Sequence, residues 1–96
     1  MRVSASEQVQ LWLMGLPPEP KRRVRLALKA LARGKAGALD VKPLRRELEG
    51  FYRLRVGDYR LVYHLEPGKH IRLDHADIRD VVYDVFRTLR ALKEEG

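Results

Sequence analysis

Residues 51–64 read FYRLRVGDYRLVYH, and this segment decides the fold. On both sides of Gly57-Asp58, apolar or aromatic side chains alternate with mostly basic ones, and a period of two is typical of β-strands. A glycine and an aspartate between two such runs favour a two-residue hairpin loop. With that loop, Arg55 lies opposite Arg60 in the ladder. We therefore expect an antiparallel β-hairpin over residues 51–64.

The two faces of this hairpin differ in chemistry. One face carries apolar and aromatic side chains, namely Tyr52, Leu54, Val56, Tyr59, Leu61 and Tyr63. The other carries three arginines, Arg53, Arg55 and Arg60. Directly opposed like charges destabilise a ladder by roughly 0.2–1 kcal/mol per pair, and an anion between Arg55 and Arg60 would relieve that repulsion. The arginine face is therefore either an anion site or a solvated surface that Asp58 or Asp74 neutralises.

The residues before the hairpin have the period of amphipathic helices. Ser4-Ala5-Ser6-Glu7 fits a capping box with Ser4 as the N-cap, and the helix that follows should stop at Pro17. A second helix is expected to start near Pro20 and to end at Gly34. The apolar positions recur at helical spacing in both: Val9, Trp12, Leu13 and Leu16, then Val24, Ala27, Leu28, Leu31 and Ala32. The two helices form a helical hairpin, whereas residues 35–49 show no period.

After the hairpin, the pattern predicts one more strand and one more helix. Ile71 and Leu73 indicate a third strand. A C-terminal helix is expected to begin at Ile78, with Asp77 or Asp74 as its cap. Its apolar residues either join the core or form a groove or dimer contact that is exposed when the partner is absent: Val85, Phe86, Leu89 and Leu92.

Together these elements predict an α+β fold, in which an N-terminal helical hairpin packs on a small antiparallel β-sheet followed by a C-terminal helix. A chain of 96 residues suits one compact domain, so we expect a single domain over residues 1–96. The absence of cysteine excludes a disulfide scaffold and cysteine-ligated metal sites. No apolar run reaches the roughly 18 residues of a membrane span, and no signal peptide is evident. We expect a cytoplasmic protein that does not bind membranes.

Basic residues outnumber acidic ones, with 20 Lys and Arg against 13 Asp and Glu and a net charge of +7. The excess lies on the second predicted helix, because residues 21–35 hold seven bases and no acid. Four of these bases, at i, i+3, i+7 and i+11, form a stripe: Arg22, Arg25, Lys29 and Arg33. Such a stripe either follows the phosphates of RNA or is a solvated helix face. The lack of acids in the segment favours an anionic partner, RNA or an acidic protein.

The chain has three histidines. His64 alternates onto the arginine face, where it is a possible acid or base, although many such histidines have no function. His70 is expected to be exposed beside a turn, and His75 to be packed on the apolar side of its strand. No spacing of His, Asp and Glu predicts a metal site, and no motif predicts a cofactor.

The hairpin and the residues before it resemble a family signature. From Leu48 to Tyr63 the chain is similar to the signature of RelE-type toxins in the RelE/ParE superfamily of bacterial toxin–antitoxin modules. Residues 73–83 are similar to that family's closing segment, in which an arginine precedes a tyrosine by four residues, here Arg79 and Tyr83. The helical hairpin before the sheet also fits, so the resemblance covers most of the chain.

This resemblance implies the toxin of a type II module, which inhibits translation and is held inactive by an acidic, partly disordered antitoxin that alone brings it to operator DNA. The implied reaction is cleavage of mRNA in the ribosomal decoding site by attack of a ribose 2′-OH, without a metal. The family's RNA-binding residues map onto Arg53 and Arg55, and its catalytic residues onto Arg60, Arg79 and Tyr83. ParE-type relatives share the scaffold but inhibit DNA gyrase. Gyrase inhibition, or an inactive toxin acting in antitoxin-dependent autoregulation, is therefore the alternative.

Overall fold

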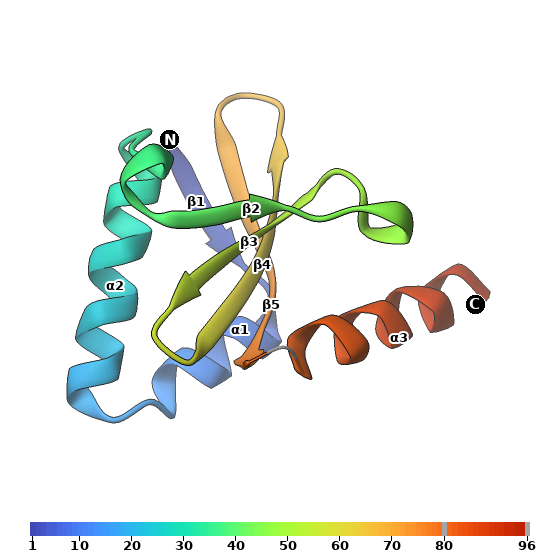
Figure 1. Ribbon diagram of the computed structural model, residues 1–96, viewed down its shortest axis with the longest axis horizontal. Coiled ribbons are helices and arrows are strands. Elements are labelled where there is room, and N and C mark those ends of the chain that lie inside the picture. The colour runs from blue at the N-terminus through green and yellow to red at the C-terminus, as the bar shows by residue number, and fades with distance from the viewer. Residues whose placement is uncertain (80, 96) are drawn as a thin grey trace.

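The computed structural model describes residues 1–79 and 81–95 of the chain (Figure 1). Its elements follow one another in the order β1 (Arg2–Ala5), α1 (Glu7–Met14), α2 (Pro18–Ala32), β2 (Asp40–Pro43), β3 (Phe51–Val56), β4 (Tyr59–Glu66), β5 (His70–Ile78) and α3 (Val81–Glu95). Short 3₁₀ turns at Ala36–Ala38 and Arg46–Leu48 flank β2. The α+β class is confirmed, with a helical hairpin before the β-hairpin and one helix after it.

The five strands form one sheet in the order β1-β5-β4-β3-β2. Strand β1 runs parallel to β5, and the other neighbours are antiparallel. In Figure 1, α1 and α2 lie to one side of the sheet and α3 extends away from its other side. The sheet is thus covered by different helices on its two faces.

The predicted β-hairpin is confirmed residue by residue. In the β3–β4 register, Arg55 lies opposite Arg60 and Leu54 opposite Leu61. The loop between the strands is Gly57-Asp58, and Gly57 adopts a φ of +59°, which a glycine reaches without strain. The apolar and the basic side chains of the hairpin therefore face opposite sides of the sheet.

The larger core lies between the apolar face of the hairpin and the helices α1 and α2. Its buried residues are Val9, Val24, Ala27 and Leu31 from the helices, and Leu54, Leu61, Tyr63, Ile71, Leu73 and Ala76 from the sheet. Trp12 adds an edge-to-face contact with Tyr59, at 5.3 Å between ring centroids. Because fully burying a leucine-sized side chain stabilises a fold by about 1.5–3 kcal/mol, this core fixes the outward direction of the arginines.

A second, smaller core packs α3 against the arginine side of the sheet. Leu48, Val62 and Phe86 are buried there, and the Phe86 ring lies 5.2 Å from that of Phe51. Three large apolar residues of α3 are instead exposed: Val85, Leu89 and Leu92. None of the described helices has the length and apolar character of a membrane span.

The prediction at the N-terminus was wrong in one respect. Ser4 lies in β1, and the N-cap of α1 is Ser6, whose Oγ accepts a hydrogen bond from the Val9 amide at 3.3 Å. Residues 2–5 instead pair with β5, almost seventy residues later in the chain. Ser4 Oγ lies 2.7 Å from Nε2 of His70 on the adjacent strand β5. Because β1 forms by pairing with so distant a segment, the sequence of residues 2–5 by itself does not predict a strand.

Strand β2 was also not predicted, because residues 35–49 contain breakers such as Gly37 and Pro43. Asp40–Pro43 pair antiparallel with β3 at the edge of the sheet, and proline is tolerated on edge strands. The sheet therefore has five strands and is mixed, whereas three antiparallel strands were expected.

The boundary between β5 and α3 lies later than predicted. Strand β5 continues to Ile78, so Asp74 and Asp77 are strand residues and neither caps a helix. The chain turns at Arg79, whose φ is +49° and whose amide donates to the Asp58 carbonyl at 2.6 Å. This hydrogen bond ties the start of the turn to the hairpin loop.

Candidate active site

Two guanidinium groups meet at the loop end of the β-hairpin. Arg55 and Arg60 are direct cross-strand partners. Both donate to the Gly57 carbonyl oxygen, Arg55 through Nε at 3.3 Å and Arg60 through Nη1 at 3.0 Å. Arg60 Nη1 also donates to the Tyr59 carbonyl at 3.2 Å. The Gly57 carbonyl oxygen thus holds both guanidinium groups close to each other, so that one anion can contact both.

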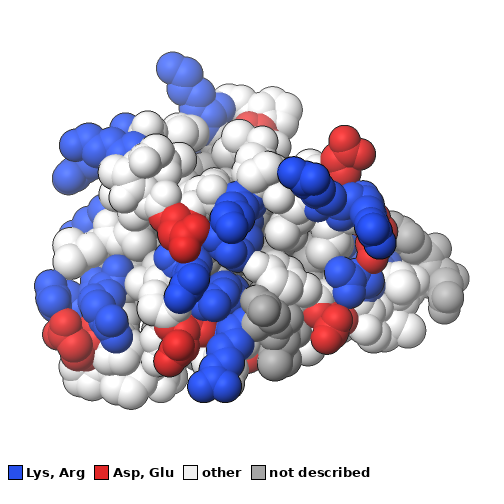
Figure 2. All heavy atoms as spheres, viewed as in Figure 1, with Lys and Arg blue, Asp and Glu red and all other residues white. Residues whose placement is uncertain are grey.

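Arg53 lies on the same face but is held differently. Its side chain is only 12% exposed and forms an ion pair with Asp40 on β2. The other Asp40 oxygen lies 4.0 Å from Nε of Arg55, whose side chain is 51% exposed. Asp40 is therefore the carboxylate that offsets positive charge on this face, a role that was expected of Asp58 or Asp74. Figure 2 shows Lys and Arg gathered over the strands in the middle of the molecule, with acidic side chains beside them.

The two predicted residues beyond β5 reach the same region. Arg79 is exposed, and its backbone is bound to the hairpin loop through Asp58. Tyr83 is half-buried and packs against the cluster of Leu48, Val62 and Phe86. Val62 is two residues from Arg60 and shares its face of β4. The structure therefore places Tyr83 on the same side of the sheet as the hairpin arginines, and the backbone of Arg79 next to the hairpin loop.

His64 lies on the same face of β4 but at the other end of the strand. Four residues separate it from Arg60, which corresponds to about 13 Å at about 3.3 Å per residue. Its Nδ1 is 2.7 Å from Asp74 Oδ2, in a groove of about 500 Å³ between the sheet and α3. Burial raises the pKa of Asp74, although the hydrogen bond from His64 opposes this shift. The predicted possible acid or base is thus separated from the pair of Arg55 and Arg60.

The other two histidines also differ from expectation. His70 is half-buried, with Nδ1 3.2 Å from Glu66 Oε1. His75 is buried, as expected, but it lies opposite Val62 and stacks on Phe86 at 6.2 Å between ring centroids. The register shift between Val62 and Tyr63 turns it to the α3 side. Alternation counted from Ile71 and Leu73 could not show this.

We expect His75 to make the fold sensitive to acid. Burial lowers its pKa, so between the folded and unfolded pKa values the unfolded chain binds more protons. The free energy of unfolding then falls as the pH is lowered below about 6.5, the unfolded value. Denaturant unfolding of the wild type and of His75→Phe at several pH values measures this effect. The difference between them should change with pH in this window, and a constant difference would contradict the assignment.

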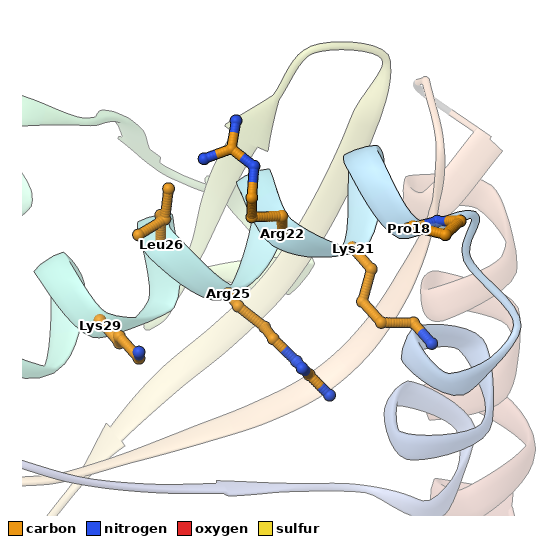
Figure 3. A pocket seen from close by; sticks show the side chains of 6 residues that line it. All are labelled: Pro18, Lys21, Arg22, Arg25, Leu26 and Lys29. Atoms are coloured by element: carbon orange, nitrogen blue, oxygen red, sulfur yellow. The ribbon is translucent and has the colours of Figure 1, made fainter.

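The basic stripe on α2 is only partly free. Arg25, Lys29 and Arg33 are exposed, but Arg22 forms an ion pair with Glu19 at 2.7 Å. In Figure 3, Lys21, Arg25 and Lys29 point to one side of the helix, and Arg22 and Leu26 to the other. A shallow groove of about 420 Å³ lies along this outer surface.

Two charged residues near the arginine cluster were not assigned to the site by the sequence analysis. Asp40 lies in β2, where Asp40 and Lys42 alternate with the inward Val41, a pattern too short to predict a strand. Arg23 approaches the hairpin loop from α2, with Nη1 3.7 Å from the position that a Cβ on Gly57 would occupy. Its neighbour Val24 is buried, which is the signal that this part of α2 faces the protein.

Comparison with known proteins places the chain in a family. No protein-family model matches it. A chain of the toxin–antitoxin complex RelBE2 from Mycobacterium tuberculosis is 32% identical, covering 81% of this chain and 96% of that chain with a TM-score of 0.58. The chain belongs to the RelE-type toxins of the RelE/ParE superfamily.

Two further comparisons agree with this family. The RelE-type fold recurs in the RelB–RelE antitoxin–toxin complex from Methanococcus jannaschii, with a TM-score of 0.68 at 23% identity, covering 85% of this chain and 96% of that chain. The toxin RelE of Mycobacterium tuberculosis (strain ATCC 25618 / H37Rv) is 44% identical over 43 residues. That match spans 44% of this chain and 44% of that toxin, less than half of its length.

Proposed function

We propose that this RelE-type toxin acts in a type II toxin–antitoxin module and stops translation by cutting mRNA on the ribosome. The observation that carries the proposal is the meeting of Arg55 and Arg60 at the Gly57 carbonyl, with Arg79 tied to the same loop. Guanidinium groups bind phosphate oxygens through paired N–H donors. A phosphodiester placed against this loop would meet several of them together.

The proposed reaction is an internal transfer at phosphorus. The ribose 2′-OH loses its proton and attacks the adjacent phosphorus, the bond from phosphorus to the 5′ oxygen breaks, and that oxygen takes up a proton. The products are a 2′,3′-cyclic phosphate and a 5′-hydroxyl. Negative charge grows on the non-bridging oxygens in the transition state, and donors fixed in advance stabilise it there. This is the role of Arg60 and Arg79.

The other residues have supporting roles in this proposal. Arg55, half-exposed beside Arg60, binds the RNA backbone. Arg53 is nearly buried against Asp40, so it adds positive charge to the site from beneath the surface. Arginine remains protonated and is therefore a poor base. We assign base stacking or proton transfer to Tyr83. The other candidate for an acid or base, His64, lies about 13 Å along the strand from Arg60.

The partners follow from the family and from the charge. RelE-type relatives are found in complexes with antitoxins, and we propose that an acidic, partly disordered antitoxin inhibits this toxin and brings it to operator DNA. The exposed bases of α2, Arg25, Lys29 and Arg33, bind ribosomal RNA in this scheme. The reaction takes place in the cytoplasm, where translating ribosomes are found.

Binding to ribosomes should therefore weaken with salt, and Arg25 should contribute more than Arg22. Each phosphate contact adds about 0.7–0.9 to the slope of log affinity against log salt concentration. Arg25→Gln is expected to lower the slope by about that amount. Arg22→Gln should change it less, because Glu19 already offsets that charge. Ribosome binding measured over a series of salt concentrations checks this, and equal slopes for both variants would contradict it.

Expression in cells tests the proposed function against its alternatives. The toxin should arrest growth, and primer extension on a reporter mRNA should show new 5′ ends within codons being translated. Intact mRNA together with inhibited DNA supercoiling would indicate a gyrase inhibitor instead. Normal growth would indicate an inactive toxin that acts only in antitoxin-dependent autoregulation. A matched strain expressing toxin and antitoxin together should grow and keep its mRNA intact.

A further inference from the structure

We propose that Asp40 is a positioning residue that holds Arg53 and Arg55 in place for the RNA phosphate. This inference rests on the proposed function, since it concerns the same arginine cluster. Asp40 lies on edge strand β2 and is the cross-strand partner of Arg55. It therefore presents a carboxylate to the face of the sheet that carries the arginines.

The two oxygens of Asp40 serve two different guanidinium groups. Oδ1 accepts a hydrogen bond from Nη2 of Arg53, and Oδ2 lies 4.0 Å from Nε of Arg55. Arg53 and Arg55 are two residues apart on β3 and share one face. Without a counter-charge, the cations of this face would repel one another and separate. Asp40 removes part of this repulsion before any RNA is bound.

The positions of the two arginines show what this contact does. Arg53 is 12% exposed, so its ion pair with Asp40 is largely shielded from water and fixes the side chain. Arg55 is 51% exposed and has Asp40 on one side, while its Nε donates to the Gly57 carbonyl at 3.3 Å. Neither of these contacts uses the Nη atoms of Arg55. These contacts hold the Arg55 guanidinium through its Nε, while half of the side chain remains exposed to the solvent.

Removing the carboxylate should therefore separate binding from catalysis. Asp40→Asn makes the cluster more positive, so RNA binding is expected to stay equal or to tighten. The released arginines lose their fixed geometry and hold the RNA phosphate less accurately against Arg60 and Arg79, and misplacement of the reacting groups lowers the rate. Loss of an arginine would instead weaken both. A slower reaction with undiminished affinity is the signature of a positioning carboxylate.

The experiment measures single-turnover cleavage of mRNA bound to ribosomes over a range of toxin concentrations. For Asp40→Asn we expect the maximal rate to fall on the order of tenfold, with the half-saturating concentration unchanged or lower. Glu49→Gln is the matched control, since it removes one exposed negative charge just before β3. It should behave as the wild type. An unchanged rate for Asp40→Asn, or an equal loss in Glu49→Gln, would overturn the proposal.

A double-mutant cycle shows whether Asp40 acts through Arg53. Adding Asp40→Asn to Arg53→Gln should lower the rate by a smaller factor than Asp40→Asn does in the wild type, because the contact with Arg53 is already lost and only that with Arg55 remains. Additive losses would contradict action through Arg53. Asp40→Glu keeps the carboxylate and should recover part of the rate if the site tolerates the longer side chain. A rate equal to that of Asp40→Asn would count against a role for the charge.

A measurement without RNA separates this proposal from the proposed function. Hydrogen exchange at the Nε–H groups of Arg53 and Arg55, followed by NMR on the folded protein, reports how firmly the side chains are held. Exchange should quicken in Asp40→Asn and stay unchanged in Glu49→Gln. If no mRNA is cut by any variant but this change is seen, Asp40 still positions the arginines and only the proposed reaction fails. Unchanged exchange would overturn the positioning role.

Discussion

Arg60→Gln should lower the single-turnover rate of mRNA cleavage on the ribosome by a factor of about a hundred to a thousand, the usual cost of losing one donor to transition-state charge. Arg60 is half-buried, and its Nη1 is fixed by the carbonyls of Gly57 and Tyr59 at 3.0 and 3.2 Å. Glutamine keeps part of the length but has no charge. The measurement is the rate at saturating toxin with end-labelled mRNA.

Two further variants make this prediction specific. Arg60→Lys should be intermediate, because lysine keeps the charge but not the planar set of donors. Arg45→Gln removes an exposed arginine between β2 and β3 and should cut as fast as the wild type. Thermal unfolding confirms that all three variants are folded. A rate for Arg60→Gln within threefold of the wild type would show that Arg60 does not act on the phosphate.

Phe86→Ala should destabilise the protein by about 3–5 kcal/mol, which is typical for truncating a buried phenylalanine. Phe86 is 7% exposed and packs on Phe51 at 5.2 Å and on His75 at 6.2 Å between ring centroids. These contacts hold α3 on the sheet. Because α3 also carries Tyr83, mRNA cleavage should decrease in the same variant even at a temperature where it remains folded. Denaturant unfolding gives the free energy.

The matched control for this prediction is on the same helix. Leu92 is 60% exposed, so Leu92→Ala should change the free energy of unfolding by no more than about 0.5 kcal/mol. It should leave cleavage unaffected. A loss below 1 kcal/mol for Phe86→Ala, or equal losses in both variants, would mean that this packing does not anchor α3.

The central hairpin was predictable because its information is local. Alternation on both sides of a glycine-aspartate loop fixes both the register and the faces, and every cross-strand pair from Val56–Tyr59 to Phe51–His64 follows from it. The first two helices were predictable for the same reason, since apolar spacing and prolines mark them. In these segments the local pattern and the tertiary structure agree.

The edge strands could not be predicted in this way. Strands β1 and β2 have four residues each, and β1 is defined by pairing with β5 at the far end of the chain. The start of α3 was misplaced because Ile78, which fits the helical period, is held in β5 opposite Tyr59. Tertiary pairing outweighed local propensity at both places.

The candidate site was predictable in its composition but not in its detail. Alternation placed Arg53, Arg55 and Arg60 on one face, and the structure agrees. It could not show that Arg53 is nearly buried, because the carboxylate responsible lies on the unpredicted strand β2. Nor does a shared face imply proximity, as the separation of His64 from Arg60 shows.

The central claim is that the arginine face acts on a phosphodiester of mRNA whose neighbouring 2′-OH is the nucleophile. The most direct test uses purified toxin with ribosomes programmed by an mRNA carrying one 2′-deoxyribose in the decoding site. We predict that normal mRNA is cut there to leave a 2′,3′-cyclic phosphate, and that the deoxy substitution abolishes that cut. Cleavage that persists at the substituted position, or normal mRNA that stays intact, would contradict the account.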